Sequence, residues 1–255
     1  MTEPLIQTHA DNGILEIRFN RPERKNALNL AMYSELVALL QNTAEDRQVQ
    51  VVILAGNGGC FTSGNDLQDF INGAQIGFSD SPLGQFLWAL ATYPKPVIAA
   101  VDGVAVGIGT TMLLHCDLVY ASQSSEFKLP FAQLGLCPEY ASSFLLPRIA
   151  GHAKASEWLL LGESFSAEAA LQGGLLNAVI EQPLSYAREQ AQKLTRMPSK
   201  ALRRTKAMLK APLMPRVQKV MMAEADAFIE ALQGPEFAEA AAAFFEKRQP
   251  DFSKC

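Results

Sequence analysis

The chain has 255 residues, of which 49% are hydrophobic and 19% are charged. This length suits one large domain, or a domain with an appendage, and the composition excludes wholesale disorder because it supports a sizeable buried core. The net charge of −4 argues against nucleic acid as the main ligand, since phosphate backbones bind basic surfaces. No apolar stretch reaches the roughly 20 residues that a membrane span needs.

Short apolar segments alternate with helical stretches in the first two thirds of the chain. Ile14–Phe19 alternates apolar and polar residues, as a half-buried strand does. Asn29 is a suitable N-cap for a helix over residues 30–40. Buried strands are predicted at 49–55, 96–101, 117–121 and 175–180. Such alternation predicts a layered α/β core.

The last quarter of the chain predicts helix after helix. From about Leu184 onward it is rich in Ala, Leu, Met, Lys and Glu, with breaks near Pro198, at 212–215 and at Gly234-Pro235. We therefore divide the chain into an α/β core at residues 1–195 and a helical region at residues 196–255.

The cysteines and the N-terminus indicate the compartment. Cys60, Cys116, Cys137 and Cys255 show no paired spacing, which predicts neither a zinc site nor a disulfide framework. Residues 1–10 lack the basic and apolar segments of a secretory signal. We expect a cytoplasmic protein with no metal site.

A glycine-containing junction follows the predicted strand at 49–55. Gly64 permits backbone conformations that are closed to other residues, and N–H groups at such a turn can bind an anion together. The alternative is an ordinary strand–helix loop in which Ser63 or Asp66 caps the helix.

A second junction spans residues 101–111, and an apolar helix over 112–116 is predicted to start within it. The first N–H groups of a helix have no internal partner, so an oxyanion would fit against Gly107–Gly109. Met112 stands where a dinucleotide fingerprint has its third glycine. The alternative is close helix–sheet packing that requires glycine. Two N–H donors converging from both junctions would form an oxyanion hole, often worth a few kcal/mol per donor in the transition state.

Six segments form one ordered pattern along the chain. They are Asn20-Arg21-Pro22, residues 25–29, Ser-Gly-Asn-Asp-Leu at 63–67, residues 102–109, Cys116-Asp117 and residues 244–252. In this order they resemble the crotonase (enoyl-CoA hydratase/isomerase) superfamily over essentially the whole chain. The resemblance implies a spiral core of ββα turns followed by a C-terminal helical trimerisation region. It also implies an acyl-CoA thioester substrate, no cofactor besides that CoA, and a homotrimer or dimer of trimers.

The resemblance also implies roles for particular residues. The N–H groups of Asn65 and Ile108 correspond to the family's oxyanion donors. The CoA moiety is expected to contact the two junctions and the segment before the first helix, through Lys25, Ala27, Leu28, Ser63, Gly64, Asn65, Asp66, Leu67 and Gly109.

The glutamates narrow the expected reaction. Enoyl-CoA hydratases carry two glutamates where this chain has Thr111 and Phe131, so efficient hydration is not expected. Residues 129–143 are similar to peroxisomal-type Δ3,Δ2-enoyl-CoA isomerases, in which the glutamate after a proline is the single catalytic base. That glutamate is Glu139, after Pro138. Partial burial would raise its pKa and make it a better proton shuttle near neutral pH.

Alternatives remain open at this point. Taken alone, Glu139 also fits a first-turn helix glutamate beside Pro138 that the helix dipole favours. For the function, the alternatives are hydration or hydrolysis of a CoA thioester, or a non-catalytic acyl-CoA-binding member of the family.

Other polar side chains receive structural interpretations. His115 is expected to be a satisfied core histidine, and Asp117 shows no pattern of partners. Lys247 could reach CoA. The basic cluster is expected to be a solvated helix face with possible contacts to CoA phosphates, and it comprises Arg203, Arg204, Lys206 and Lys210.

Overall fold

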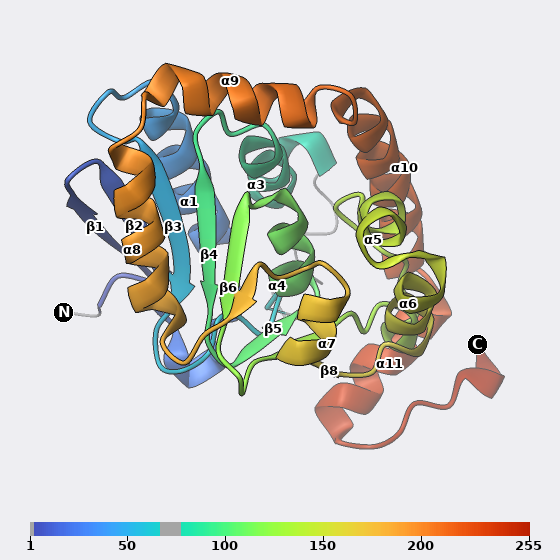
Figure 1. Cartoon of the computed structure of the whole chain (residues 1–255). Helices are drawn as coiled ribbons and strands as arrows, with labels where there is room; N and C mark the ends of the chain where they lie inside the picture. Colours follow the sequence, from blue (N-terminus) through green and yellow to red (C-terminus); the bar gives the residue numbers. More distant parts are fainter. Residues whose placement is uncertain (1–2, 67–77) are drawn as a thin grey trace.

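A computed structural model describes residues 3–66 and 78–255, and the predicted CoA contact Leu67 lies outside the described residues. The larger of two sheets has the strand order β1-β2-β3-β4-β6-β9 and is parallel except for the β1–β2 hairpin (Figure 1). Its strands are β1 Ile6–Asp11, β2 Ile14–Phe19, β3 Val51–Gly56, β4 Val97–Val101, β6 Leu118–Ala121 and β9 Ala178–Val179. The predicted α/β class is confirmed.

A smaller sheet pairs three short strands beside the larger one. It contains β5 Val104–Val106, β7 Glu126–Lys128 and β8 Phe165–Ser166. β5 runs parallel to β7, and β8 runs antiparallel to it. This sheet brings the second junction, which contains β5, beside the segment that leads toward residue 139.

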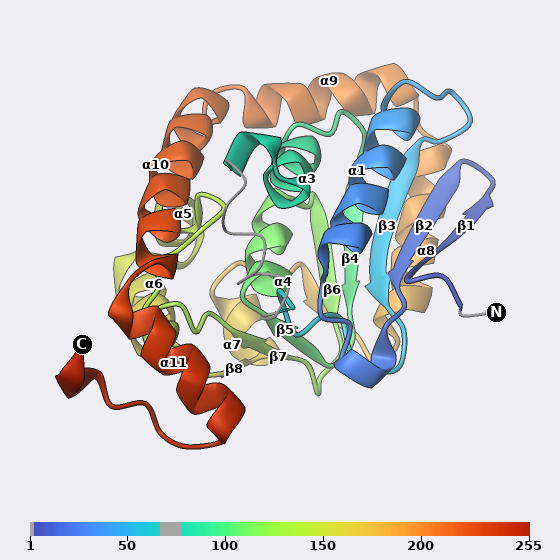
Figure 2. The ribbon, with the colours of Figure 1, turned by 180° about the vertical axis from the view of Figure 1, so that it is seen from behind.

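Helices cover both faces of the larger sheet. α8 (Pro183–Thr195) packs on β3, β4 and β6, where its buried alanines meet the strands. α1 (Leu30–Ala44) and α3 (Pro82–Ala91) lie on the opposite face and pack against each other (Figure 2). The side chain of Asn29 accepts a hydrogen bond from Met32 N at 2.9 Å, so the predicted cap of α1 is confirmed. Within the described residues, the other short α-helices are α4 Ile108–Thr111, α5 Ser142–Ala150, α6 His152–Ser156 and α7 Ala167–Gln172.

The predicted helical tail is confirmed, with helix ends at the predicted breaks. It consists of α9 Ser199–Lys210, α10 Met214–Leu232 and α11 Pro235–Glu246. In Figure 1, α9 crosses the top of the molecule and α10 descends along the side, where it packs on α5. Val217, Met221 and Phe228 of α10 belong to the main hydrophobic core. α10 therefore contributes to the same core as the sheet.

Two predicted elements differ in the structure. The strand at 175–180 shrinks to β9, because Leu175 and Leu176 are buried in the turn after α7, where Leu175 N donates to Ala170 O at 2.9 Å. The helix expected over 112–116 begins earlier, at Ile108, and continues as a 3₁₀ turn over Met112–His115.

Two structural interpretations of charged residues are wrong. Lys206 is buried, not solvated, and its Nζ donates to Asp117 Oδ2 at 2.6 Å. Asp117 therefore has a partner, and the same oxygen accepts Val97 N at 2.7 Å. Lys210 donates to His115 O at 3.1 Å and Ala91 O at 3.0 Å. These lysines satisfy polar groups at one end of the sheet, because α9 passes directly over it.

Candidate active site

The two junctions lie against each other, as the oxyanion-hole hypothesis requires. Thr62 N donates to Val104 O at 3.0 Å, and Val106 N donates to Thr62 O at 3.1 Å. Gly64 has φ +94°, and a Cβ there would lie 2.8 Å from Val106 O. Only glycine fits this conformation and this close approach. The strand-like pairing thus places Gly64 and Asn65 beside the start of α4.

The N–H groups of Asn65 and Ile108 are available for a ligand. Within residues 3–66 and 78–255, no acceptor receives a hydrogen bond from either one. Ile108 is the first residue of α4, after Gly107 with φ +55°. Two unpaired backbone donors at neighbouring turns can stabilise a negatively charged oxygen.

The expected CoA-contacting segments also lie together. Ser63 N donates to Lys25 O at 2.9 Å, Leu28 N donates to Gly64 O at 2.8 Å, and Asp66 N donates to Leu28 O at 2.8 Å. Residues 25–28 and 63–66 therefore form one paired surface. Gly109 packs on the same strand pairing, because a Cβ there would lie 2.6 Å from Thr62 Cγ2.

Side chains that the sequence patterns did not single out hold this surface in place. The buried Asn26 side chain donates to Cys60 O at 2.6 Å and Asn57 O at 2.9 Å. Arg21 Nη1 pairs with Asp66 Oδ2 at 2.6 Å. Asp66 thus makes an ion pair with the preceding segment. Both residues belong to segments of the family pattern: Arg21 to Asn-Arg-Pro and Asn26 to Lys-Asn-Ala-Leu. Those segments were the signal by which sequence reasoning could have found these contacts.

Glu139 reaches the second junction through Thr111. Thr111 Oγ1, on α4, donates a hydrogen bond to Glu139 Oε1. α4 therefore links the Ile108 N–H to the carboxyl group within one short helix. Thr111, at the position of an absent hydratase glutamate, acquires a role that the sequence did not indicate. Phe131, at the other such position, is buried against Phe228 with ring centroids 6.4 Å apart.

Burial raises the pKa of Glu139 to about 8, and the nearby Glu224 carboxylate adds to the rise, whereas the Thr111 hydrogen bond opposes it. A carboxyl group poised near neutral pH can accept and return a proton. Glu139 is not a first-turn helix residue, because α5 begins only at Ser142. The helix-dipole interpretation is therefore wrong.

Two buried tyrosines, Tyr33 and Tyr140, lie near the Glu139 carboxyl group. Tyr33 of α1 is buried and donates to Asn65 Oδ1 at 2.5 Å. Burial and the charge of Glu139 hold the Tyr33 pKa well above its ordinary value. Tyr140 stacks on His115 with centroids 3.8 Å apart, and His115 Nε2 lies 2.9 Å from Tyr140 O. Burial lowers the pKa of His115 to about 3, which fits the predicted neutral core histidine.

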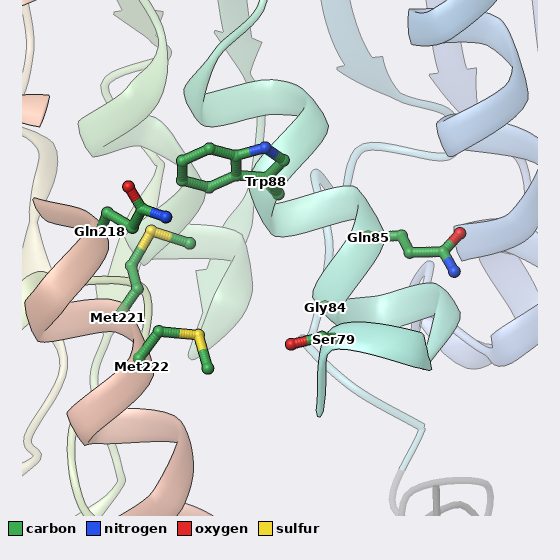
Figure 3. Close-up of a pocket in the computed structure, with 7 residues that line it drawn as sticks. All are labelled: Ser79, Gly84, Gln85, Trp88, Gln218, Met221 and Met222. Carbon is green, nitrogen blue, oxygen red and sulfur yellow. The ribbon is translucent and has the colours of Figure 1, made fainter. Parts of the chain in front are cut away.

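An apolar pocket of about 230 Å³ opens between α3 and α10 (Figure 3). Trp88 of α3 and Met221 and Met222 of α10 line it. The same helices contact the turn after Glu139: the hydroxyl of Tyr140 donates to Leu87 O of α3 at 2.8 Å, and Ala141 N donates to Glu224 Oε2 of α10 at 2.5 Å. The pocket and the candidate catalytic turn therefore share both helices.

Other site classes find no support in the described part of the chain. Among these residues, no group of three His, Cys, Asp or Glu side chains could hold a metal ion. No described helix is both long and apolar enough to cross a membrane. All four cysteines are free thiols. Lys247 is exposed at the end of α11.

Known proteins resemble this chain in sequence. The profile of the enoyl-CoA hydratase/isomerase family matches residues 9–254. Enoyl-CoA delta isomerase 2 of Homo sapiens is 40% identical over 183 residues, which cover 69% of this chain and 46% of the relative. The chain spans about half the length of the delta isomerases that it matches. The 2,3-dehydroadipyl-CoA hydratase of Escherichia coli is 34% identical over 94% of each chain.

Solved structures share the fold. The structure of Pseudomonas aeruginosa OdaA has a TM-score of 0.92 and 45% identity, and it covers 95% of this chain and 99% of that one. Isomerases and a hydratase match at comparable identity, so the comparisons leave the reaction open. The predicted resemblance is confirmed: this chain belongs to the enoyl-CoA hydratase/isomerase family and has the crotonase fold.

Proposed function

We propose that the chain is an isomerase that moves the double bond of a 3-enoyl-CoA to the 2-position, with Glu139 as its single acid/base. The observation that carries the proposal is the Thr111–Glu139 hydrogen bond, because it links the carboxyl group to the helix that begins at Ile108. Glu139 is thereby the carboxyl group held beside the candidate oxyanion donors.

The reaction needs one base and one oxyanion site. The Glu139 carboxylate removes a proton from C2, and the electrons move into the thioester to form a dienolate. The N–H groups of Asn65 and Ile108 stabilise its oxygen. Protonated Glu139 then returns the proton at C4, so the double bond lies between C2 and C3. A pKa of about 8 suits both halves of this transfer.

Hydration is less well supported by these side chains. Adding water across a double bond uses one group to deprotonate water and another to protonate carbon. Thr111 cannot act as a carboxylate base, and Phe131 offers no proton. The residues that replace the hydratase glutamates therefore favour isomerisation over hydration.

We assign the acyl chain of the substrate to the pocket between α3 and α10, because it is apolar and both helices contact the Glu139 turn. Met222→Trp would fill it. The expected result is a lower kcat/KM for long 3-enoyl chains with short chains unaffected. An unchanged chain-length profile would reject the assignment.

We also propose the homotrimer or dimer of trimers that the resemblance implies. Large apolar side chains stay exposed on the single chain, including Leu160 at 72%, Met208 at 76% and Phe244 at 64% exposure. Such side chains are common where subunits meet. Light scattering after size exclusion tests this proposal, and a monomer at micromolar concentration would contradict it.

A substrate panel separates the candidate functions. The purified protein is given a 3-enoyl-CoA, a 2-enoyl-CoA and a saturated acyl-CoA, and the products are identified by NMR. The proposal predicts conversion of the 3-enoyl ester alone. Water addition to the 2-enoyl ester would favour a hydratase, release of free CoA would favour a hydrolase, and binding without turnover would favour a non-catalytic member.

A further inference from the structure

The turn after Glu139 has an unusual backbone. Tyr140 and Ala141 are both left-handed, with φ of +61° and +57°, and neither is glycine. Each such residue costs of order 1–3 kcal/mol and persists only when surrounding contacts impose the conformation. Contacts from outside the turn must therefore hold this backbone conformation. Glu139 immediately precedes the turn.

The contacts that hold the turn come from α10. Glu224 Oε2 accepts Ala141 N at 2.5 Å, and Oε1 accepts both Ser143 N at 3.0 Å and Ser143 Oγ at 2.5 Å. Both carboxylate oxygens are used. Ala141 is the N-cap position of α5 and has no capping side chain of its own. Glu224 thus supplies from another helix the cap that α5 lacks.

We propose that Glu224 is a positioning residue for Glu139: it fixes the left-handed turn at residues 140–141 and so presents the Glu139 carboxyl group to Thr111. This inference rests on the proposed catalytic role of Glu139. Glu224 is 7% exposed, and among the described residues its carboxylate accepts hydrogen bonds from Ala141 and Ser143, so it acts through the turn that follows Glu139.

The charges around this pair define what a variant should change. Glu224 raises the pKa of Glu139, and burial and the charge of Glu139 in turn raise the pKa of Tyr33 and Tyr140. On the outer side, Cys137, Arg216 and Lys219 line a pocket that also reaches Glu224. Loss of the Glu224 charge lowers the pKa of Glu139, whereas loss of the Thr111 hydrogen bond raises it, so positioning is tested by kcat, KM and the backbone of the turn.

Glu224→Gln tests the inference. The amide keeps the shape of the side chain but has one acceptor oxygen, whereas Ala141 N and Ser143 N donate to two different oxygens of Glu224. Asp226→Asn is the matched control, since it removes an equal charge from an exposed position on α10. We expect Glu224→Gln to lower kcat about tenfold to a hundredfold. We also expect an acyl-CoA KM within about threefold of wild type. Asp226→Asn should change none of these.

A kcat equal to wild type would overturn the inference. So would a kcat loss accompanied by an equal rise in the acyl-CoA KM, since that indicates general damage to the site. If Glu224→Gln does not fold, Ser143→Ala decides, because it removes one donor and keeps both backbone contacts. A kcat several-fold below wild type at unchanged Tm is then expected, and an unchanged kcat would refute the inference.

Failure of the proposed function can be recognised separately. If the wild-type protein isomerises no 3-enoyl-CoA, that function falls, and the backbone NMR chemical shifts of Tyr140 and Ala141 then test Glu224 without turnover. Shifts that leave the left-handed range in Glu224→Gln support positioning. Shifts identical in both proteins reject it.

Discussion

Replacing Glu139 by Gln should make the protein more stable at alkaline pH. In the folded chain the pKa of Glu139 is raised from 4.5 to about 8, chiefly by burial. When the pKa of a carboxyl group is higher in the folded state than in the unfolded state, the group makes its full contribution to stability below the unfolded value of 4.5. This contribution is lost as the pH rises through the folded value of about 8. Gln has no proton to lose, so the variant does not suffer this loss.

The size of the effect follows from the pKa values. At about 1.4 kcal/mol per pKa unit, the rise from 4.5 to about 8 corresponds to a ceiling of about 5 kcal/mol. Hydration of the partly exposed residue lowers this figure, so a gain of about 2–4 kcal/mol for Glu139→Gln between pH 5 and pH 9 is expected, relative to wild type.

Urea unfolding followed by circular dichroism measures this difference at pH 5, 7 and 9, with protein concentration held constant. Glu126→Gln is the control, because Glu126 is an exposed carboxyl group at a strand end. It shows the effect of replacing a carboxyl group by an amide at an exposed position. A Glu139→Gln stability difference that does not change with pH would show that burial does not raise the pKa of Glu139.

The remaining predictions concern the two junctions. Gly64→Ala should cost about 1–3 kcal/mol of stability and most of the activity, because the new Cβ would lie 2.8 Å from a carbonyl oxygen at φ +94°; thermal unfolding and kcat/KM measure this. Thr111→Val removes the hydrogen bond that lowers the pKa of Glu139. Its pH–rate profile should show an acidic limb at higher pH and about tenfold lower activity at pH 7, whereas an unmoved limb would contradict the role of Thr111.

Local patterns predicted much of the fold. The cap at Asn29, the strand Ile14–Phe19 and the breaks between the terminal helices each depend on neighbouring residues, and all are confirmed. The hairpin partner β1 was missed although Asn12-Gly13 is a typical two-residue hairpin turn, with φ of +48° and +83°. That signal was present in the sequence.

The missed contacts join residues far apart in the chain. Lys206 pairs with Asp117, 89 residues away, and Glu224 reaches the turn at Ala141, 83 residues away. No periodicity or spacing encodes such pairs, since they depend on how α9 and α10 pack over the sheet. The family pattern predicted Glu139 as a site residue, whereas its hydrogen-bond partner on α4 emerged only from the structure.

Transfer of a label from C2 to C4 tests the single-carboxylate mechanism most directly. A 3-enoyl-CoA carrying deuterium at C2 is converted by wild type and by Glu139→Gln, and the product is analysed by NMR. Wild type should give 2-enoyl-CoA with part of the deuterium at C4, and the variant should give almost no product. Undiminished conversion and label transfer by Glu139→Gln would contradict the single-carboxylate mechanism.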